Sequence, residues 1–158
     1  MIAFTNPGGI RTSLQRNPDG VVTFADIFAT QPFGNSLVTL TLTGAQIKTL
    51  LEQQWLNQPK PRVLQVSGGF SYTWDDRRPK GDFVPTDGIA LDGRALDPAG
   101  RYRVTVNAFL ADGGDGFFVL KEATDARTGP SEVAALEEYL KANSPLTPRT
   151  PERIRRAY

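Results

Sequence analysis

The stretch SLVTLTLTGAQIKTLLEQQW, residues 36–55, decides the fold. Its first part, 37–42, alternates between two faces, as a β-strand does. One face carries Val38, Leu40 and Leu42, and the other carries Leu37, Thr39 and Thr41. Thr43 then begins a helix, because Gln46 stands three residues after it in a capping-box pattern. Apolar residues follow at helical spacing, namely Ile47, Leu50, Leu51 and Trp55. A strand that runs into a capped amphipathic helix indicates a protein that mixes both kinds of element.

Outward from this stretch, short apolar runs alternate with further helical patterns. We expect a strand at 2–5, a short helix from Thr23 that Pro32 stops, a glycine-broken strand within 62–75, and a helix from Ser131. Two strands around turn signals are expected within 88–110, in a meander. The sequence therefore predicts an α+β fold, a mixed β-sheet with packed helices. It forms one domain over 1–144, followed by an irregular tail rich in proline and arginine at 145–158.

The composition excludes several classes of function. The 158 residues are enough for one hydrophobic core. The formal net charge is +1, which does not favour a nucleic-acid partner. Histidine and cysteine are both absent, so the chain has no imidazole base, no Ser-His-Asp triad and no thiolate metal site. No apolar stretch approaches the roughly 20 residues of a membrane helix, and no signal peptide is visible.

Three loops carry the candidate site, and the first is NPGGIR at 6–11. Its Asn-Pro-Gly-Gly segment fits a type II β-turn, with Pro second and Gly third. A plain turn would not account for the amide of Asn6 and the guanidinium of Arg11 at the two ends of the loop. Such a pair suits an anion or a polar ring edge.

The second loop is QPFGNS at 31–36, and the third is NAFLADGGDGFF at 107–118. Phe33 sits on a stiff turn, where it is either a small core plug or a stacking platform. Phe109 lies at a strand end, and Asp115 stands among three glycines, either as a solvated loop acid or as part of a ligand site. Two phenylalanines, a carboxylate, an amide and an arginine together suit a nucleoside: two faces to stack on and an acceptor pair for the ribose diol.

The order of these motifs resembles the C-terminal domain of the 5'-nucleotidase family. The resemblance rests on N-x-GGIR, then PFGN-S, then LTG with an amphipathic helix, then NAFLADGGDGF, and it covers residues 3 to about 120. It implies a two-part phosphohydrolase in which an N-terminal metallophosphoesterase domain holds two divalent metal ions and the catalytic residues. The chain would then bind substrate only, with no catalytic residue, metal or other cofactor of its own, and would be inactive alone.

The resemblance also implies roles for individual residues. Phe33 and Phe109 would sandwich the nucleobase, and Asp115 would hold the ribose hydroxyls. Asn6 and Arg11 would contact the base edge, ribose or phosphate. The same loops would contribute Gly34 and Asn35, and the glycine pair at 68–69 would lie near the pocket.

One departure from the family pattern concerns the N-terminus. Family members have a helix upstream of the first strand, and this helix carries a further substrate-binding arginine, whereas Met1 here stands almost at the first motif. We therefore expect a truncated fragment that lacks its metal domain, and a homodimer contact could cover the face that the helix would protect. Family resemblance implies a periplasmic, secreted or cell-surface location.

Other functions stay open at this point. The chain could be a free-standing module that binds nucleosides or nucleotide sugars, or the substrate could be a cyclic phosphodiester or a sulfur-chain compound. An autonomous enzyme that uses carboxylates, such as Asp75 with Asp76 or Asp112 with Asp115, is the weakest alternative. Adjacent acids on a strand point to opposite faces, and a glycine loop is a poor place to bury a carboxylate.

Overall fold

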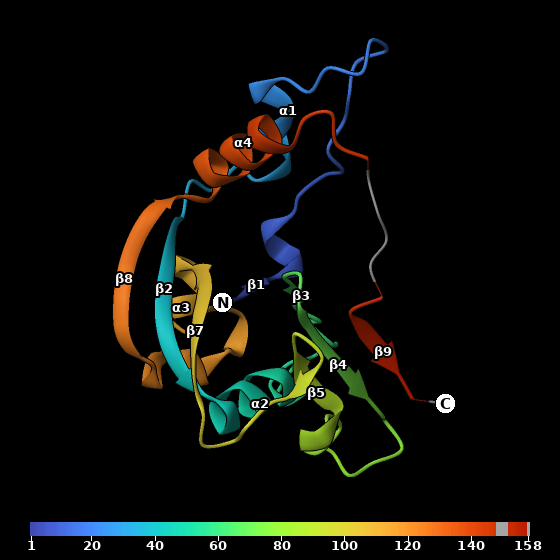
Figure 1. Cartoon of the computed structure of the whole chain (residues 1–158), viewed down its shortest axis with the longest axis vertical. Coiled ribbons are helices and arrows are strands. Elements are labelled where there is room, and N and C mark those ends of the chain that lie inside the picture. Colours follow the sequence, from blue (N-terminus) through green and yellow to red (C-terminus); the bar gives the residue numbers. More distant parts are fainter. Residues whose placement is uncertain (148–151, 158) are drawn as a thin grey trace.

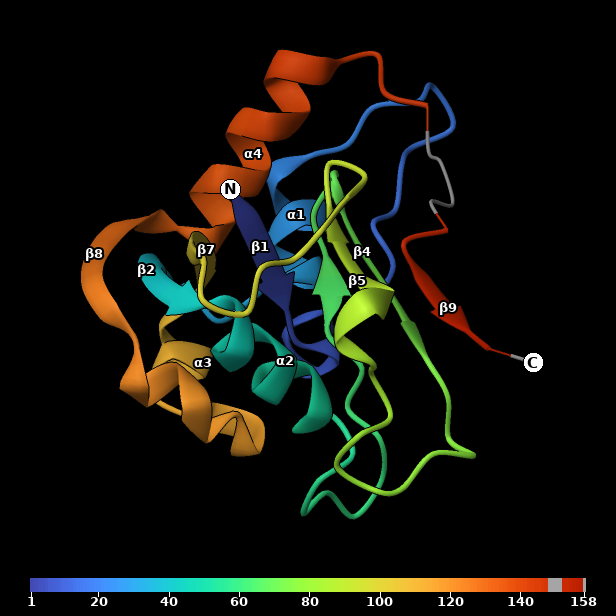
Figure 2. The same ribbon diagram turned by 60° about the horizontal axis from the view of Figure 1, so that its bottom comes forward.

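The computed structural model describes residues 1–147 and 152–157. It contains two β-sheets with helix α2 (Gly44–Glu52) between them (Figures 1 and 2). The α+β class predicted from the sequence is confirmed. The larger sheet has the order β3-β1-β7-β2-β8, and its strands are Gln65–Val66, Ile2–Thr5, Arg101–Asn107, Ser36–Thr43 and Thr124–Ser131. The smaller sheet has the order β6-β5-β4-β9, with strands Arg94–Ala95, Ile89–Leu91, Phe70–Trp74 and Ile154–Arg156.

The remaining helices lie around these sheets. Helix α1 (Phe24–Thr30) and helix α4 (Glu132–Asn143) pack against each other at one end of the molecule (Figure 1). Helix α3 (Ala108–Ala111) follows β7 directly, and 3-10 turns occupy Pro7–Gly9, Thr86–Gly88, Gly114–Gly116 and Phe118–Glu122.

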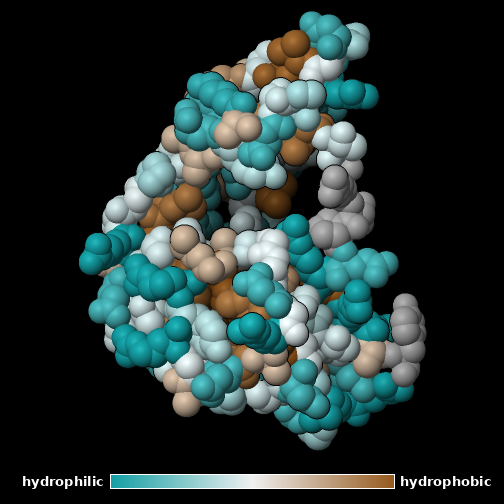
Figure 3. Space-filling model, in the orientation of Figure 1, coloured by the Kyte–Doolittle hydropathy of each residue, from teal (hydrophilic) through white to brown (hydrophobic). Residues whose placement is uncertain are grey.

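The surface is hollowed between the α1 and α4 end and the rest of the body, and apolar residues gather near that end (Figure 3). None of the helices in the described part is long and apolar enough to cross a membrane.

The capping box of α2 is present as the sequence predicts. The Thr43 hydroxyl accepts from the Gln46 backbone N–H at 3.1 Å, and the Gln46 side chain accepts from the Thr43 N–H at 2.9 Å. A side chain at Gly44 would overlap the Asp97 carbonyl, so glycine is required where this helix starts beside the turn before β7. The apolar face of α2 joins the core strands of both sheets in one cluster, which includes Ile47, Leu50, Leu51, Phe4, Leu40, Val104, Phe70 and Ile89.

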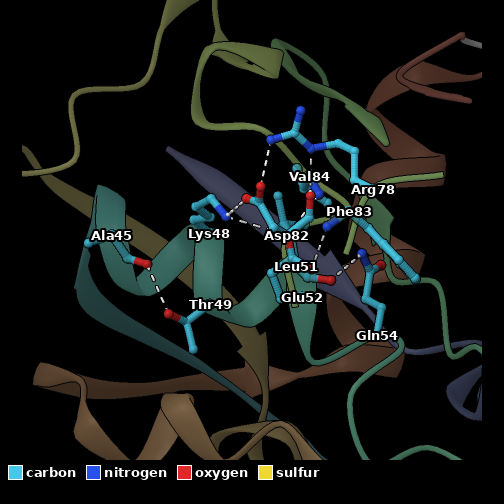
Figure 4. A network of polar contacts seen from close by, with 10 residues as sticks. All are labelled: Ala45, Lys48, Thr49, Leu51, Glu52, Gln54, Arg78, Asp82, Phe83 and Val84. Atoms are coloured by element: carbon cyan, nitrogen blue, oxygen red, sulfur yellow. Dashed lines mark hydrogen bonds and ion pairs between the residues drawn. The ribbon is translucent and has the colours of Figure 1, made fainter. Parts of the chain in front are cut away.

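A buried carboxylate ties the loop between β4 and β5 to α2 (Figure 4). Glu52 is 3% exposed and accepts from the backbone N–H groups of Phe83 and Val84 at 3.0 and 2.7 Å. Lys48 lies 3.5 Å from Glu52 and donates to Asp82 at 2.8 Å. A buried charge is tolerated when it is paired and hydrogen-bonded, so this loop is held firmly against the helix.

Gln54 fixes the segment that connects α2 to β3. Its side chain is fully buried, and its amide donates to the Leu51 carbonyl at 2.8 Å (Figure 4). Its side-chain oxygen accepts from the Leu64 N–H at 2.7 Å and from the Tyr72 hydroxyl at 3.1 Å. Its backbone carbonyl accepts from the Arg62 N–H at 2.9 Å. These contacts set the position of residues 62–64, which lie beside the site described below.

Two expectations differ from the structure, and one strand was not predicted. The strands within 88–110 do not form one meander: there are three, and β7 leaves β5 and β6 to join the larger sheet. The tail is not irregular throughout, because β9 pairs in parallel with β4. Residues 148–151 and 158 of the tail lie outside the described part. Strand β8 was not predicted, since it is exposed along almost its whole length and shows no apolar alternation.

Tyr72 makes stability depend on pH at the alkaline end. Burial raises the pKa of its phenol from 10.0 to about 12. The folded state therefore keeps a proton that the unfolded state releases above pH 10, so this contribution is complete below pH 10 and is lost as the pH rises toward 12. We expect the free energy of unfolding, measured with urea, to fall by roughly 2 kcal/mol between about pH 10 and pH 12. Tyr72→Phe should lack this step, and an identical pH dependence in the two proteins would contradict the prediction.

Candidate functional site

A cavity of about 350 Å³ lies at one edge of the larger sheet. Its lining includes six of the seven residues predicted for the site: Asn6, Arg11, Phe33, Asn35, Phe109 and Asp115. Gly34 is not part of the lining, although both of its neighbours are, and the glycine pair at 68–69 does not line it either. The other lining residues are Gly8, Gly9, Arg62 and Asn107.

The strand register explains why distant loops meet here. Strand β1 pairs in parallel with β7, so both of their carboxyl ends reach the same edge of the sheet. Strands β2, β3 and β8 run antiparallel to their neighbours, and Leu37 lies opposite Asn107, Gln65 opposite Thr5, and Ser36 opposite Ser131. The edge therefore collects the ends of β1, β7 and β8 and the beginnings of β2 and β3.

The NPGG loop forms a 3-10 turn over Pro7–Gly9. The type II turn predicted from the sequence is wrong, because Gly8 is not among the glycines with positive φ. The Gly9 N–H donates to the Asn6 carbonyl at 3.0 Å, and a side chain on Gly9 would come within 3.0 Å of the Asn6 amide oxygen. The glycine thus leaves room for the Asn6 side chain to fold back over its own loop.

The two phenylalanines are large apolar side chains left open to solvent. Phe33 is 51% exposed and Phe109 is 46% exposed. The Arg11 guanidinium carbon lies 5.5 Å from the centre of the Phe33 ring, a cation–π contact. A side chain on Gly114 would come within 2.6 Å of the Phe109 ring, so the glycine loop is shaped to receive that ring.

Asp115 is held from three directions. Its backbone has φ 57, a left-handed conformation that is uncommon for residues other than glycine. Its carbonyl accepts from the Gln58 side chain at 2.7 Å, and its carboxylate accepts from the Asn6 amide at 2.8 Å. The other carboxylate oxygen forms an ion pair with Arg62. The carboxylate is thus a fixed acceptor at the cavity wall and not a freely solvated loop acid.

A chain of buried polar side chains continues from Asn6 under the cavity. The Asn6 side-chain oxygen accepts from the Asn107 amide at 3.2 Å, and the Asn107 oxygen caps α3 by accepting from the Leu110 N–H at 2.9 Å. Glu132 is 5% exposed and accepts from the Asn107 amide at 3.4 Å and the Asn35 amide at 3.2 Å. One acid at the start of α4 therefore connects the loop of Phe33 to that of Phe109.

Sequence reasoning missed Arg62, Asn107 and Glu132. Arg62 lies in an irregular segment between two prolines and Leu64, where nothing local indicates an ion pair with a residue 53 positions away. Asn107 carried a readable signal, because an asparagine at a strand end is a typical helix N-cap. Glu132 follows the cap residue of α4 and resembles an ordinary acidic residue in a first helical turn.

The charges of the lining favour an anionic ligand. Arg11 and Arg62 are positive and Asp115 is negative, which leaves one positive charge in excess. The described residues include no group of three acidic, histidine or cysteine side chains that could hold a metal ion. A second cavity of about 540 Å³ shares Arg62 and Asp115 with the first, so the ion pair stands between two open spaces.

The chain matches the family model for the 5'-nucleotidase C-terminal domain over residues 1–122. It belongs to this family. Members of the family include 5'-nucleotidases, which are hydrolases. The fold agrees with this membership, since a 5'-nucleotidase precursor from Thermus thermophilus superimposes with a TM-score of 0.82 at 38% identity, covering 98% of this chain and 31% of that one.

Two further relatives extend the comparison. Cell wall protein Lmo0130 of Listeria monocytogenes is 34% identical over 143 residues, which is 88% of this chain and 18% of the relative. A 5'-nucleotidase-related protein of Glossina morsitans morsitans is 34% identical over 163 residues, which is 97% of this chain and 29% of the relative. The chain thus spans less than a third of each of these proteins.

Glu132 should contribute to stability through its two amide contacts. Glu132→Gln keeps only one of the two acceptor oxygens, so its new NH2 group faces the amide of either Asn107 or Asn35, and the negative charge that strengthens both contacts is lost. We expect the free energy of unfolding to fall by about 1 to 3 kcal/mol, the usual cost of an unsatisfied buried group. Urea unfolding measures this loss. The control is Glu138→Gln in the same helix, whose side chain is 78% exposed and which should change stability by less than about 0.5 kcal/mol. Equal effects of the two substitutions would contradict the prediction.

Proposed function

We propose that this chain is the substrate-binding domain of a two-domain, metal-dependent 5'-nucleotidase-like phosphohydrolase and that its cavity holds a nucleotide. The observation that carries the proposal is the lining of the cavity: two half-exposed phenylalanines, a fixed carboxylate and two arginines from segments far apart in the sequence. If the two phenylalanines served only the stability of the fold, we would expect their rings to be buried, with no opening between them. A ligand with one flat apolar part, hydroxyl groups and a negative charge satisfies all of these groups.

The rings of Phe33 and Phe109 suit a nucleobase. Stacking of a base on an aromatic side chain contributes about 1 to 3 kcal/mol, and every base offers such a face. The Arg11 guanidinium lies over the Phe33 ring, and the Phe109 ring fits against Gly114. Pre-positioned rings lose little side-chain entropy when the base enters.

The polar groups suit the rest of a nucleotide. The Asp115 carboxylate accepts only one hydrogen bond on each oxygen from the described side chains, so each oxygen can accept another from a ribose hydroxyl. The excess positive charge of the lining, with Arg11 beside Phe33, suits a phosphate. A neutral nucleoside would use the stacking and diol contacts but not this charge.

The division of labour follows from what the chain supplies. It contains no histidine, and the described acids form no metal site, so the two divalent metal ions that the family resemblance implies would belong to another domain of the whole protein. This chain would capture and orient the nucleotide, which is the proximity part of catalysis. It would be inactive alone, and the whole protein would act in nucleotide catabolism.

Two further expectations belong to the same proposal. The whole protein would lie at the cell surface or be secreted, which is supported by the name of the Listeria relative, a cell wall protein. The homodimer expected from the sequence has no separate support from the described contacts and stays a prediction.

Removal of one ring tests the proposal. Titration of the chain with AMP, followed by calorimetry or NMR, should give saturable binding, and Phe109→Ala should weaken it by about 10-fold to 100-fold because a stacking face is lost. Phe24→Ala is the matched control, since Phe24 is 57% exposed but lies on α1 and does not line the cavity. The control should bind AMP as the unchanged chain does.

The outcomes separate the parts of the proposal. Absence of saturable AMP binding by a folded chain, or equal losses in both variants, would contradict the nucleotide site. Binding by this chain, combined with no AMP hydrolysis by the whole protein in the presence of divalent metal ions, would favour the free-standing binding module instead.

A further inference from the structure

We propose that Arg62 is a specificity-determining residue that makes the site prefer ribonucleotides to 2'-deoxyribonucleotides by fixing the Asp115 carboxylate. The proposal rests on the proposed function, because it assumes that the cavity holds a nucleotide. Arg62 acts here as a positioning residue through its ion pair with Asp115.

The Asp115 loop needs an external restraint. Gly113, Gly114 and Gly116 surround the acid, and two of these glycines have positive φ, so the loop backbone has many accessible conformations when nothing holds it. The Asp115 carboxylate is 14% exposed, and it contacts one neutral donor, Asn6, and one cation, Arg62. The charged contact is the stronger of the two kinds, so Arg62 contributes most to the orientation of the carboxylate.

The geometry leaves the right acceptors free for a vicinal diol. A carboxylate offers about four lone-pair positions on its two oxygens. Arg62 uses one position on Oδ1, and Asn6 uses one on Oδ2. Each oxygen therefore keeps an acceptor position, and a ribose can donate one hydroxyl to each. A 2'-deoxyribose can donate only one hydroxyl, so it leaves one oxygen of a partly buried carboxylate without this partner.

Arg62 itself is well placed for this role. Its backbone N–H donates to the carbonyl of the fully buried Gln54, which fixes the start of the segment. Its Nε atom is buried and finds no acceptor among the described residues, so the contact with Asp115 is what orients the guanidinium. The same residue lines both cavities, so its head borders the space where the sugar would lie next to Asp115.

The test compares the affinities of AMP and 2'-deoxy-AMP. The unchanged chain should bind AMP about 10-fold or more tightly than 2'-deoxy-AMP, which is the usual effect of one charge-assisted hydrogen bond. Arg62→Met keeps much of the apolar stem but removes the cation, and its affinity ratio should fall to near one. The loss should occur mainly in AMP binding. Calorimetric titration gives both constants, and thermal unfolding shows whether each variant is folded.

Two controls isolate the mechanism. Arg11→Met removes the other cation of the cavity and leaves the contacts of Asp115 intact. It should weaken the binding of AMP and of 2'-deoxy-AMP equally, so the ratio of the two affinities should not change. Arg101→Met removes an exposed ion pair with Asp125 on another part of the surface, and it should change neither constant. Arg62→Gln, which keeps neutral donors, serves as the second variant if Arg62→Met does not fold.

The results that overturn the inference differ from those that overturn the nucleotide site. An unchanged ratio in a folded Arg62 variant, or a ratio near one in the unchanged chain, would reject the role of Arg62 while AMP binding continued to support the proposed function. Failure of the unchanged chain to bind either ligand would reject the proposed function itself.

Discussion

The parallel pairing of β1 with β7 is the constraint on which the rest of the site depends. It brings the carboxyl ends of two strands, about 100 residues apart in the sequence, to one edge of the larger sheet. The antiparallel strands on either side then add the loops of Phe33, Arg62 and Glu132 to the same edge. A shift of β1 by one residue against β7 would turn the side chains of one strand to the opposite face of the sheet, and the contact between Asn6 and Asn107 would be lost. The hydrophobic core sets the register, so it also sets the site.

The buried polar side chains at this edge carry a second constraint. Asn6, Asn107 and Glu132 are each about 95% buried, and such groups are costly unless they are hydrogen-bonded. Each finds its partners only in the native arrangement, so an alternative packing of these loops would leave several of them unsatisfied. The chain of contacts from Asp115 to Asn35 thus makes the cavity walls depend on one another.

The sequence predicted the parts of the molecule whose causes are local. The strand at 36–43 and the helix after Thr43 follow from periodicity and capping, and three recognisable loops supplied the seven residues predicted for the site, six of which line the cavity. Prediction from the sequence failed where a feature depends on residues that are far apart in the sequence. The partner of Arg62 is 53 residues away, and β8 is an exposed edge strand whose formation depends on pairing with β2. The prediction for the turn at Gly8 was wrong for another reason, since Pro-Gly suits two turn types and the chain adopts the 3-10 form here.

The exposure of the two phenylalanine rings separates the requirements of binding from those of stability. About half of each ring faces solvent in the described structure, and burying that surface would stabilise the domain. Gly114 does not help to bury the ring. It leaves room for the Phe109 ring beside the cavity, where a larger residue would push the ring away. A ring kept open between fixed polar groups gains its contacts only when a flat ligand enters. The free energy that the fold leaves ungained at this edge is therefore available for binding a ligand, and the proposed function requires this of a domain that orients a substrate for another domain.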